Sequence, residues 1–193
     1  KQGHAIAAAL ADLGAQVTLV SGPTQERAPD SVTVATVQTA EQMLNACQSA
    51  LPVDVAVCAA AVSDWRVSDP SGQKRKKDKG GAPILTLIEN PDILATLSTQ
   101  EENRPDLVVG FAAETENIIE NAQIKRLSKH CDWVIANDVT GGFGGDENAV
   151  HIITAEGVDS WPTMSKRAVA NQLAERIADH VSTDVRTQQA NED

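Results

Sequence analysis

Residues 53–65 read Val-Asp-Val-Ala-Val-Cys-Ala-Ala-Ala-Val-Ser-Asp-Trp, and this stretch decides the fold. Its first six residues are rich in valine, with Asp54 as the one polar residue, and they predict a strand of a parallel sheet. Small and polar residues follow directly, at the carboxyl end of that strand. Because open α/β sheets bind ligands at the carboxyl ends of their strands, we expect a functional site here.

Outward from this stretch, predicted strands and helices alternate. The strands cover residues 16–20, 32–37, 53–58, 84–88, 107–111, 133–136 and 150–153, the last of them paired near Val158. The strand at residues 16–20 is predicted to be a buried parallel strand. The helices cover residues 5–13, 39–49, 91–98, 116–129 and 166–181. Pro91 is expected at the first position of the helix at residues 91–98. This order predicts an α/β fold: a doubly wound, mostly parallel, Rossmann-like sheet with helices on both faces.

The predicted sheet lacks its first strand. The chain opens with Lys1-Gln2-Gly3-His4, which leads straight into a helical pattern, whereas a doubly wound domain normally opens with a strand and a glycine-rich turn. We therefore expect an N-terminally incomplete domain over residues 1–182, followed by a polar, disordered tail over residues 183–193.

The composition excludes several classes of function. The chain has 193 residues, 41% of them hydrophobic, and a net charge of −11, which suits one globular domain and argues against nucleic-acid binding. Its apolar runs are shorter than the roughly 18 residues that span a bilayer. The three cysteines lack metal-site or disulfide-framework spacing. We expect a cytoplasmic protein with reduced cysteines and neither nucleic-acid nor membrane partners.

Two glycine-containing turns are candidate anion sites. Gly3 lies at the mouth of the first predicted helix, where backbone N–H groups favour a phosphate, although it could equally serve only to pack the helix. Ser21 and Gly22 follow the strand at residues 16–20 and offer donors to a phosphate or a sugar, or form only a turn. A nicotinamide-dependent dehydrogenase would carry an acid where this chain has Ser21. The next acid, Glu26, lies beyond the turn, which weakens that alternative.

The stretch after residue 58 offers a pocket. Its small side chains let a ligand lie against the backbone, and Asp64 presents a carboxylate to a metal, a sugar hydroxyl or a base amine. Close packing of sheet on helix, with Asp64 as a cap, explains the same residues equally well.

A cationic segment follows Asp64. Six of the chain's 16 basic residues lie in it: Arg66, Lys74, Arg75, Lys76, Lys77 and Lys79. Nearby glycines and a proline predict a flexible loop. Such runs are usually solvated faces, but in so acidic a chain this one favours a polyanionic substrate.

Two further lysines, Lys125 and Lys129, share one face of a predicted helix, either as phosphate ligands or as ordinary surface lysines. The four histidines show no zinc-site spacing, and nucleophile-elbow and P-loop motifs are absent from the sequence.

Together these segments resemble the phosphopantothenoylcysteine synthetase (phosphopantothenate–cysteine ligase) domain of bacterial coenzyme A biosynthesis. The most specific motifs are Ala-Ala-Val-x-Asp-Trp, Asn-Pro-Asp-Ile and Val-Gly-Phe-Ala-Ala-Glu-Thr. The stretches that carry the resemblance are residues 3–14, 17–23, 59–65, 73–77, 90–94, 108–115, 125–129, 136–139 and 142–151.

The resemblance implies a two-step reaction. In this family the carboxylate of 4′-phosphopantothenate attacks the α-phosphate of CTP, assisted by Mg²⁺, and L-cysteine then displaces CMP from the acyl-cytidylate. It also implies a homodimer, formed through an arm that we place at residues 84–88 and 150–153. A fused decarboxylase half would carry FMN, which this chain does not bind.

The resemblance also implies residue roles. Lys74 corresponds to the catalytic, nucleotide-binding lysine of a flap, Asp64 to a cytidine contact and Ala60 to an alanine lining the site. The other nucleotide-binding positions are Pro91, Asp92, Ile93, Leu94, Phe111, Lys125 and Lys129.

One departure from the family concerns an essential Asn in an Asn-x-Ser-Ser-Gly-Lys stretch, whose final residue corresponds to Lys1. We therefore expect the chain as given to be inactive or impaired. The alternatives that stay open are a nicotinamide-dependent Rossmann oxidoreductase and a nucleotide-binding domain without catalysis.

Overall fold

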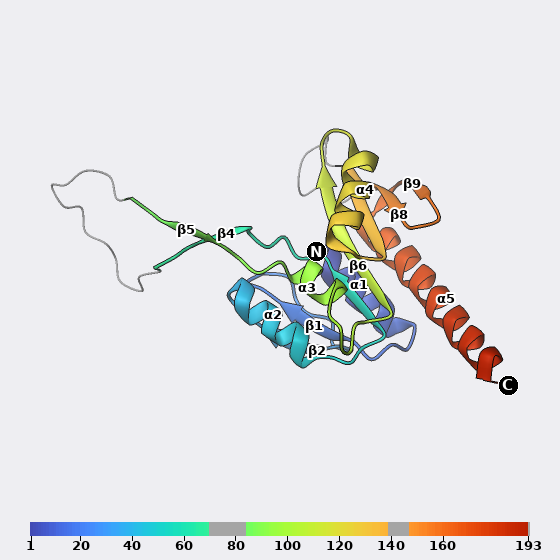
Figure 1. The fold of residues 1–193 in the computed structure, drawn as a ribbon. Helices are drawn as coiled ribbons and strands as arrows, with labels where there is room; N and C mark the ends of the chain where they lie inside the picture. The colour runs from blue at the N-terminus through green and yellow to red at the C-terminus, as the bar shows by residue number, and fades with distance from the viewer. Residues whose placement is uncertain (70–83, 139–146, 193) are drawn as a thin grey trace.

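The centre of the molecule is a five-stranded sheet with the order β3-β6-β7-β8-β9. The computed structural model describes residues 1–69, 84–138 and 147–192 (Figure 1). The strands are β3 (Val55–Cys58), β6 (Leu107–Glu114), β7 (Trp133–Asp138), β8 (Glu147–Ile153) and β9 (Val158–Ser165). The first three are parallel and the last two antiparallel, which confirms the predicted mostly parallel α/β fold.

Alternate residues of β6 face opposite sides of this sheet. Leu107 and Val109 belong to a core cluster with α1 (Gln2–Asp12) and α5 (Lys166–Glu192), whereas Val108 packs with α4 (Ile118–Lys129). This period of two is what a strand with two covered faces requires. Helices therefore lie on both faces of the sheet, as the sequence predicted.

A separate parallel pair, β1 (Thr18–Ser21) and β2 (Thr33–Thr36), lies beside the sheet with α2 (Ala40–Ser49). Thr39 and Gln42 form a capping box that starts α2. In the described ranges β1 pairs only with β2, so the parallel sheet is divided between β1 and β3. The prediction that β1 is buried is wrong: its residues are exposed or half-buried, because among the described residues β1 pairs only with β2 and lies outside the five-stranded sheet.

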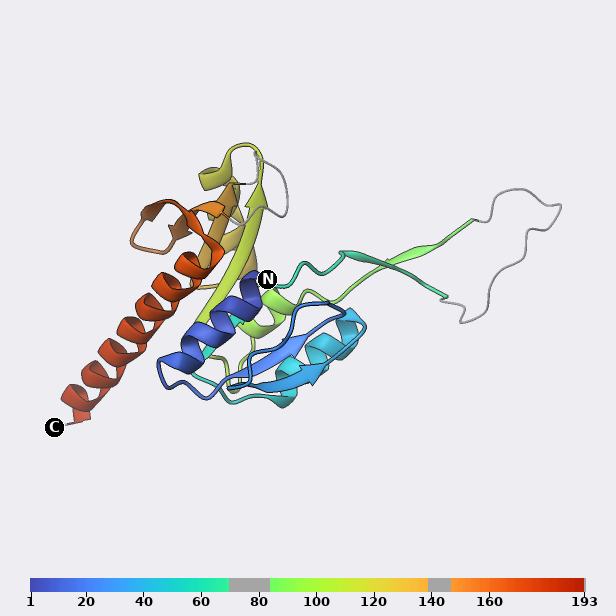
Figure 2. The same ribbon diagram turned by 180° about the vertical axis from the view of Figure 1, so that it is seen from behind.

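An antiparallel arm projects from the body in both views (Figures 1 and 2). It consists of β4 (Trp65–Val67) and β5 (Leu87–Glu89), with Arg66 opposite Ile88. The arm confirms the expected small antiparallel element. Placing residues 150–153 in the arm was wrong, because Val150, Ile152 and Ile153 are fully buried in β8, between β7 and β9.

The last helix, α5, continues to Glu192 over the residues for which the sequence predicted a disordered tail. The division of the chain at residue 182 stays a prediction. Within the described part of the chain, none of the helices combines the length and the apolar character needed to cross a membrane.

Candidate functional site

The short helix α3 (Ile93–Ser98) positions the centre of the candidate site. It begins after Asp92, whose Oδ1 accepts a hydrogen bond from the backbone N–H of Ala95 at 2.9 Å. Asp92 is therefore the N-cap. The prediction that Pro91 is the first helical residue was wrong, because the aspartate after it supplies the cap.

The second carboxylate oxygen of Asp92 binds a cation from another helix. Lys129 is the last residue of α4, and its Nζ donates to Oδ2 of Asp92 at 2.5 Å. The two side chains keep 36% and 43% of their exposed area, so the pair is open to solvent. One carboxylate thus joins α3 to α4 and holds an ammonium group at the protein surface.

This ion pair shifts the pKa of both partners. Partial burial works to raise the pKa of Asp92, but the hydrogen bonds from Lys129 and Ala95 and the charges of Lys129 and Lys125 together lower it below its usual range. The hydrogen bond to Asp92 raises the pKa of Lys129, with smaller contributions from the charges of Asp92 and Asp64. Both groups are therefore charged at neutral pH.

The same electrostatic interactions show which predicted residues share the site. Lys129 feels the carboxylate of Asp64, and Asp92 feels the ammonium of Lys125. Asp64 is exposed, and its carbonyl oxygen accepts a hydrogen bond from the backbone N–H of Asn90 at 2.8 Å. Lys125 lies one turn before Lys129 on α4, so the four charged residues predicted to bind nucleotide in the described ranges lie near the start of α3.

Strand β6 forms the floor beneath α3. A Cβ atom on Gly110 would lie only 2.6 Å from Cδ2 of Leu94, so glycine is what allows α3 to sit this close to the strand. Ile93 is buried in the neighbouring cluster, and Phe111, the residue after Gly110, is half-buried. Ile93 and Leu94 therefore fix α3 against the sheet, whereas Phe111 packs with the core cluster on the opposite face, the one that α1 and α5 cover.

Other predicted residues lie apart from this group or beyond what is described. Ser21 is the last residue of β1 and Gly22 follows it beside α2, where a Cβ on Gly22 would touch Met43 at 3.5 Å. Ala60 is exposed in the loop after β3. Lys74, together with the lysines near it in sequence, lies outside the described residues.

Gly3 lies inside α1, and its Cβ would touch Ala59 at an ordinary 3.5 Å. The mouth of this helix is thus next to the loop after β3. Where a metal is concerned, no group of three or more His, Cys, Asp or Glu side chains converges on one point within the described ranges.

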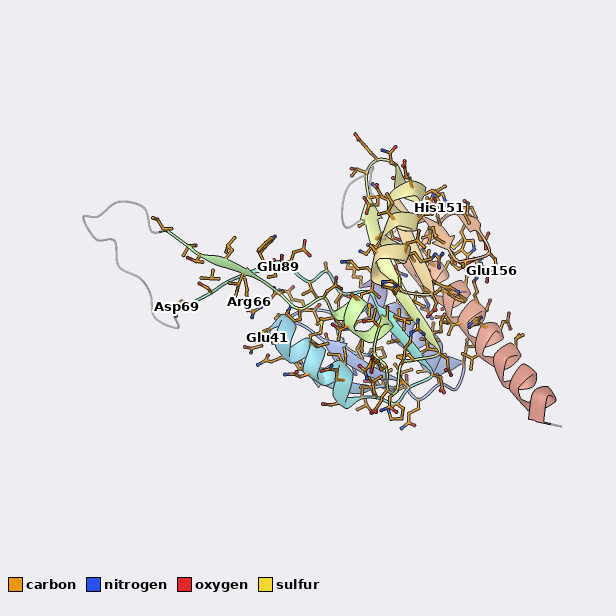
Figure 3. The ribbon with its side chains drawn as sticks, in the orientation of Figure 1. Glu41, Arg66, Asp69, Glu89, His151 and Glu156 are labelled. Atoms are coloured by element: carbon orange, nitrogen blue, oxygen red, sulfur yellow. The ribbon has the colours of Figure 1, made fainter. Side chains whose placement is uncertain are left out.

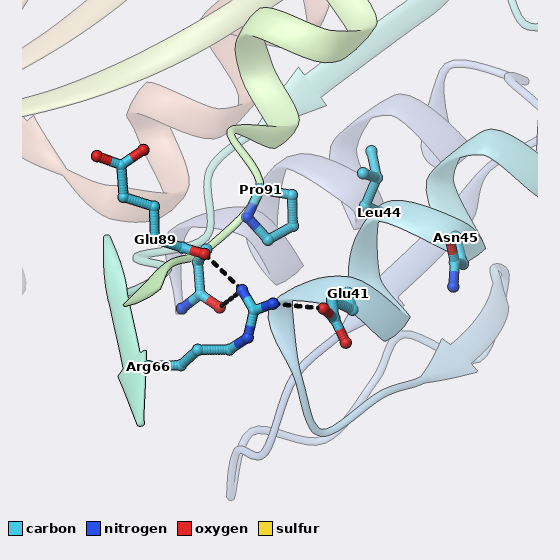
Figure 4. A pocket seen from close by; sticks show the side chains of 7 residues that line it. Glu41, Leu44, Asn45, Arg66, Glu89 and Pro91 are labelled. Atoms are coloured by element: carbon cyan, nitrogen blue, oxygen red, sulfur yellow. Dashed lines mark hydrogen bonds and ion pairs between the residues drawn. The ribbon is translucent and has the colours of Figure 1, made fainter. Parts of the chain in front are cut away.

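Arg66 was interpreted incorrectly from the sequence. It lies in β4 rather than in a loop, and its charge is engaged by Glu41 of α2 (Figures 3 and 4). Arg66, Glu41 and Asn90 surround a hollow of about 420 Å³ at the base of the arm. Sequence reasoning missed Glu41 and the structural role of Asn90, although Asn-Pro-Asp-Ile contains the latter.

The chain was also compared with known proteins. The family model described as "DNA/pantothenate metabolism flavoprotein C-terminal domain" matches residues 1–181. The coenzyme A biosynthesis bifunctional protein CoaBC of Vibrio vulnificus (strain YJ016) is 38% identical over 182 residues, which cover 92% of this chain and 45% of that protein. The chain therefore spans less than half the length of this curated relative.

Solved structures share the fold. The crystal structure of the C-terminal domain of a CoaBC protein has a TM-score of 0.76 and 33% identity, and the match covers 94% of this chain and 83% of that one. A Cab2 variant, H337A, in complex with phosphopantothenate-cysteine has a TM-score of 0.63 and 20% identity, over 82% and 56% of the two chains. The match to the family model over residues 1–181, with 38% identity to a bifunctional relative, shows that the chain belongs to the family of the C-terminal domain of DNA/pantothenate metabolism flavoproteins.

Proposed function

We propose that this chain is the domain that joins 4′-phosphopantothenate to L-cysteine in coenzyme A biosynthesis, using CTP and an acyl-cytidylate intermediate. The observation that carries the proposal is the ion pair of Lys129 with Asp92 at the start of α3, beside the backbone hydrogen bond that holds Asp64 to Asn90, with Lys125 one turn before Lys129 on α4. The names of the relatives support coenzyme A biosynthesis as the context.

The first proposed step activates a carboxylate. A carboxylate oxygen of 4′-phosphopantothenate attacks the α-phosphorus of CTP, a P–O bond forms, and pyrophosphate leaves with the electron pair of the bond that breaks. Lys125 and Lys129 would neutralise charge on the phosphates, and Lys74 would act as the catalytic lysine. Asp64 would accept hydrogen bonds from the cytidine.

The second proposed step forms the amide. The amine of cysteine attacks the acyl carbon, CMP leaves with the electron pair of the C–O bond, and the ammonium of the adduct loses a proton. Residues from Pro91 to Leu94 would hold the cytosine and ribose, because the N–H groups before α3 can read base edges. Phe111 and Ala60 would line the pocket, and Ser21 and Gly22 stay predicted contacts.

Mg²⁺ fits this proposal as a partner of the triphosphate. Magnesium ions in nucleotide sites are often held by one or two carboxylates together with substrate phosphates. Asp64 is an exposed carboxylate, and a single exposed carboxylate suits that arrangement better than a cage built by the protein.

The proposed partners follow from the relatives. A decarboxylase half with FMN would accompany this domain in a bifunctional protein, and the arm would pair two copies of the chain as a homodimer. We expect the protein to work in the cytoplasm. The nicotinamide-dependent alternative stays weak, because β1 ends in Ser21 rather than in an acid.

The test is pyrophosphate release by the full-length protein from CTP and 4′-phosphopantothenate, with and without cysteine. We expect release that requires phosphopantothenate, and the cysteine adduct when cysteine is added. Lys74→Gln should abolish ligation while leaving CTP binding nearly intact. The control is Lys166→Gln, the same charge change at the start of α5.

Three outcomes separate the alternatives. Activity with ATP but not CTP would support the ligase assignment and change the nucleotide that we assign to it. CTP binding without turnover in the wild type would favour a binding module. Equal turnover in the wild type and Lys74→Gln would refute the assigned role of this lysine.

A further inference from the structure

The guanidinium group of Arg66 joins three elements at the base of the arm. Its Nη1 donates to the carbonyl oxygen of Glu89 at 2.5 Å and to Oδ1 of Asn90 at 3.3 Å. Its Nη2 donates to Oε1 of Glu41 at 2.7 Å (Figure 4). A single side chain of β4 thus binds the end of β5, the entrance to α3 and the first turn of α2.

Asn90 carries this constraint to the candidate nucleotide site. Its side-chain N–H donates to the carbonyl oxygen of Ser63 at 2.8 Å, and its backbone N–H donates to the carbonyl of Asp64. Asn90 also precedes Asp92 by two residues. With its amide oxygen held by Arg66 and its amide nitrogen held by Ser63, this side chain has one fixed orientation between Asp64 and Asp92.

The geometry requires arginine. A planar guanidinium can reach acceptors on two sides at once, whereas the ammonium of lysine concentrates its donors at one point. The Arg66 side chain is about one-third exposed and that of Glu41 more than half, so the bond to Asn90 is the part-buried member of this set and the ion pair with Glu41 is open to solvent. Because these contacts bind Arg66 to the protein itself, the side chain is better suited to positioning than to capturing a polyanion.

We propose that Arg66 is a positioning residue for the nucleotide site. Its junction with Glu41, Glu89 and Asn90 fixes the angle at which the arm leaves the body. Through Asn90 it also fixes the separation of Asp64 and Asp92. This inference rests on the proposed function only for the identity of the ligand, CTP.

The first experiment measures steady-state kinetics of Arg66→Gln in the full-length protein. Loss of hydrogen bonds to a charged donor should raise the KM for CTP about tenfold, with the KM for cysteine unchanged. A variant that merely folds less well would lower kcat through a smaller active fraction and leave both KM values as they are. Arg66→Lys should rescue little of the effect.

Two further variants sharpen the result. Glu41→Gln keeps a hydrogen-bond acceptor for Arg66 but removes the negative charge of Glu41, so it should give a smaller rise in the KM for CTP. This variant keeps the proposal testable if Arg66→Gln does not fold. Arg27→Gln is the matched control. Arg27 pairs with Asp30 at 2.9 Å, and both side chains are more than four-fifths exposed, so kinetics should not change.

Amide hydrogen exchange without nucleotide tests the junction independently of the reaction. The N–H of Asn90 should exchange about tenfold faster in Arg66→Gln than in the wild type, because its hydrogen bond to Asp64 opens more often. If the wild type neither binds CTP nor releases pyrophosphate, the proposed function fails and exchange at Asn90 alone decides the junction. An unchanged KM for CTP in an active enzyme, or unchanged exchange at Asn90, would overturn the inference.

Discussion

At the scale of single residues, Asp92 both caps α3 and pairs with Lys129, and one substitution can separate these two roles. Asparagine caps helices as well as aspartate does, so Asp92→Asn should keep the start of α3 and lose only the ion pair with Lys129. For so exposed a pair we expect a loss of about 0.2–1 kcal/mol in unfolding free energy at pH 7, measured by urea denaturation.

The pH dependence of that difference follows from the two pKa shifts. The pKa of Asp92 is lowered, so its contribution is present above the ordinary value of about 3.9 and disappears as the pH falls through the lowered pKa. The pKa of Lys129 is raised, so the contribution also disappears as the pH rises through that raised value. Asp30→Asn, in an exposed pair, is the control; a constant difference between wild type and Asp92→Asn from pH 2 to 8 would contradict this account.

Cys58 offers a second test at this scale. Burial, helped by the neighbouring Cys47, Cys131 and Asp92, raises the pKa of its thiol to about 12. At pH 8 the thiolate fraction is then roughly a thousandfold smaller than for an ordinary cysteine, so we expect alkylation by iodoacetamide to be slower by about that factor. Mass spectrometry after timed labelling measures this. Labelling of Cys58 as fast as that of a free thiol in the folded protein would refute the prediction.

At the scale of elements, the packing of α3 on β6 depends on Gly110. A methyl group there would displace Leu94, and overpacking of this kind costs about 1–3 kcal/mol. Because the atom displaced is the flexible end of the half-buried Leu94 side chain, Gly110→Ala should lower the unfolding free energy by about 1 kcal/mol, the low end of that range, and weaken the proposed CTP binding, as measured by urea denaturation and calorimetry. Gly3→Ala, whose new methyl group would meet Ala59 at ordinary distance, should not destabilise the protein.

Sequence patterns predicted the elements well where burial alone determines them. Residues 107–111 and 133–136 are apolar runs, and they lie in strands with completely buried centres. β4 was missed because three residues show no periodicity, and the strand exists only through its pairing with β5. Residues 150–153 were assigned to the arm because an apolar run does not reveal which sheet buries it.

The charged residues of the candidate site could be predicted from the sequence, whereas the contacts that hold them in place could not. Asp64, Asp92, Lys125 and Lys129 came from motifs, and the fold brings them together. The junction at Arg66 joins residues 23–25 positions apart in the chain, through side-chain orientations that local sequence does not encode. Reading Arg66 as one of a run of cations concealed this role.

At the scale of the whole molecule, the arm presents apolar side chains that the body does not cover. Ile84 is 92% exposed, and Trp65, Leu85 and Leu87 are each more than half exposed. Such a surface is typical of an interface, and we expect two copies of the chain to pair through it. Leu87→Glu should shift the protein from dimer to monomer in analytical ultracentrifugation. The control is Leu127→Glu, on an exposed part of α4, and an equal effect of both variants would contradict an interface at the arm.

The division of the sheet between β1 and β3 has a consequence for cooperativity. The wing formed by β1, β2 and α2 is joined to the rest by side-chain packing, without a strand ladder among the described residues. In this 193-residue chain it can therefore melt as a separate unit. Two of the three tryptophans, Trp133 and Trp161, lie in the five-stranded sheet, so their fluorescence would not register that event, and only Trp65, beside Arg66 in the arm, could report it. We expect the circular dichroism signal to begin changing at a lower urea concentration than the tryptophan emission does. The contact between Glu41 and Arg66, which anchors the arm, should be lost in this first transition.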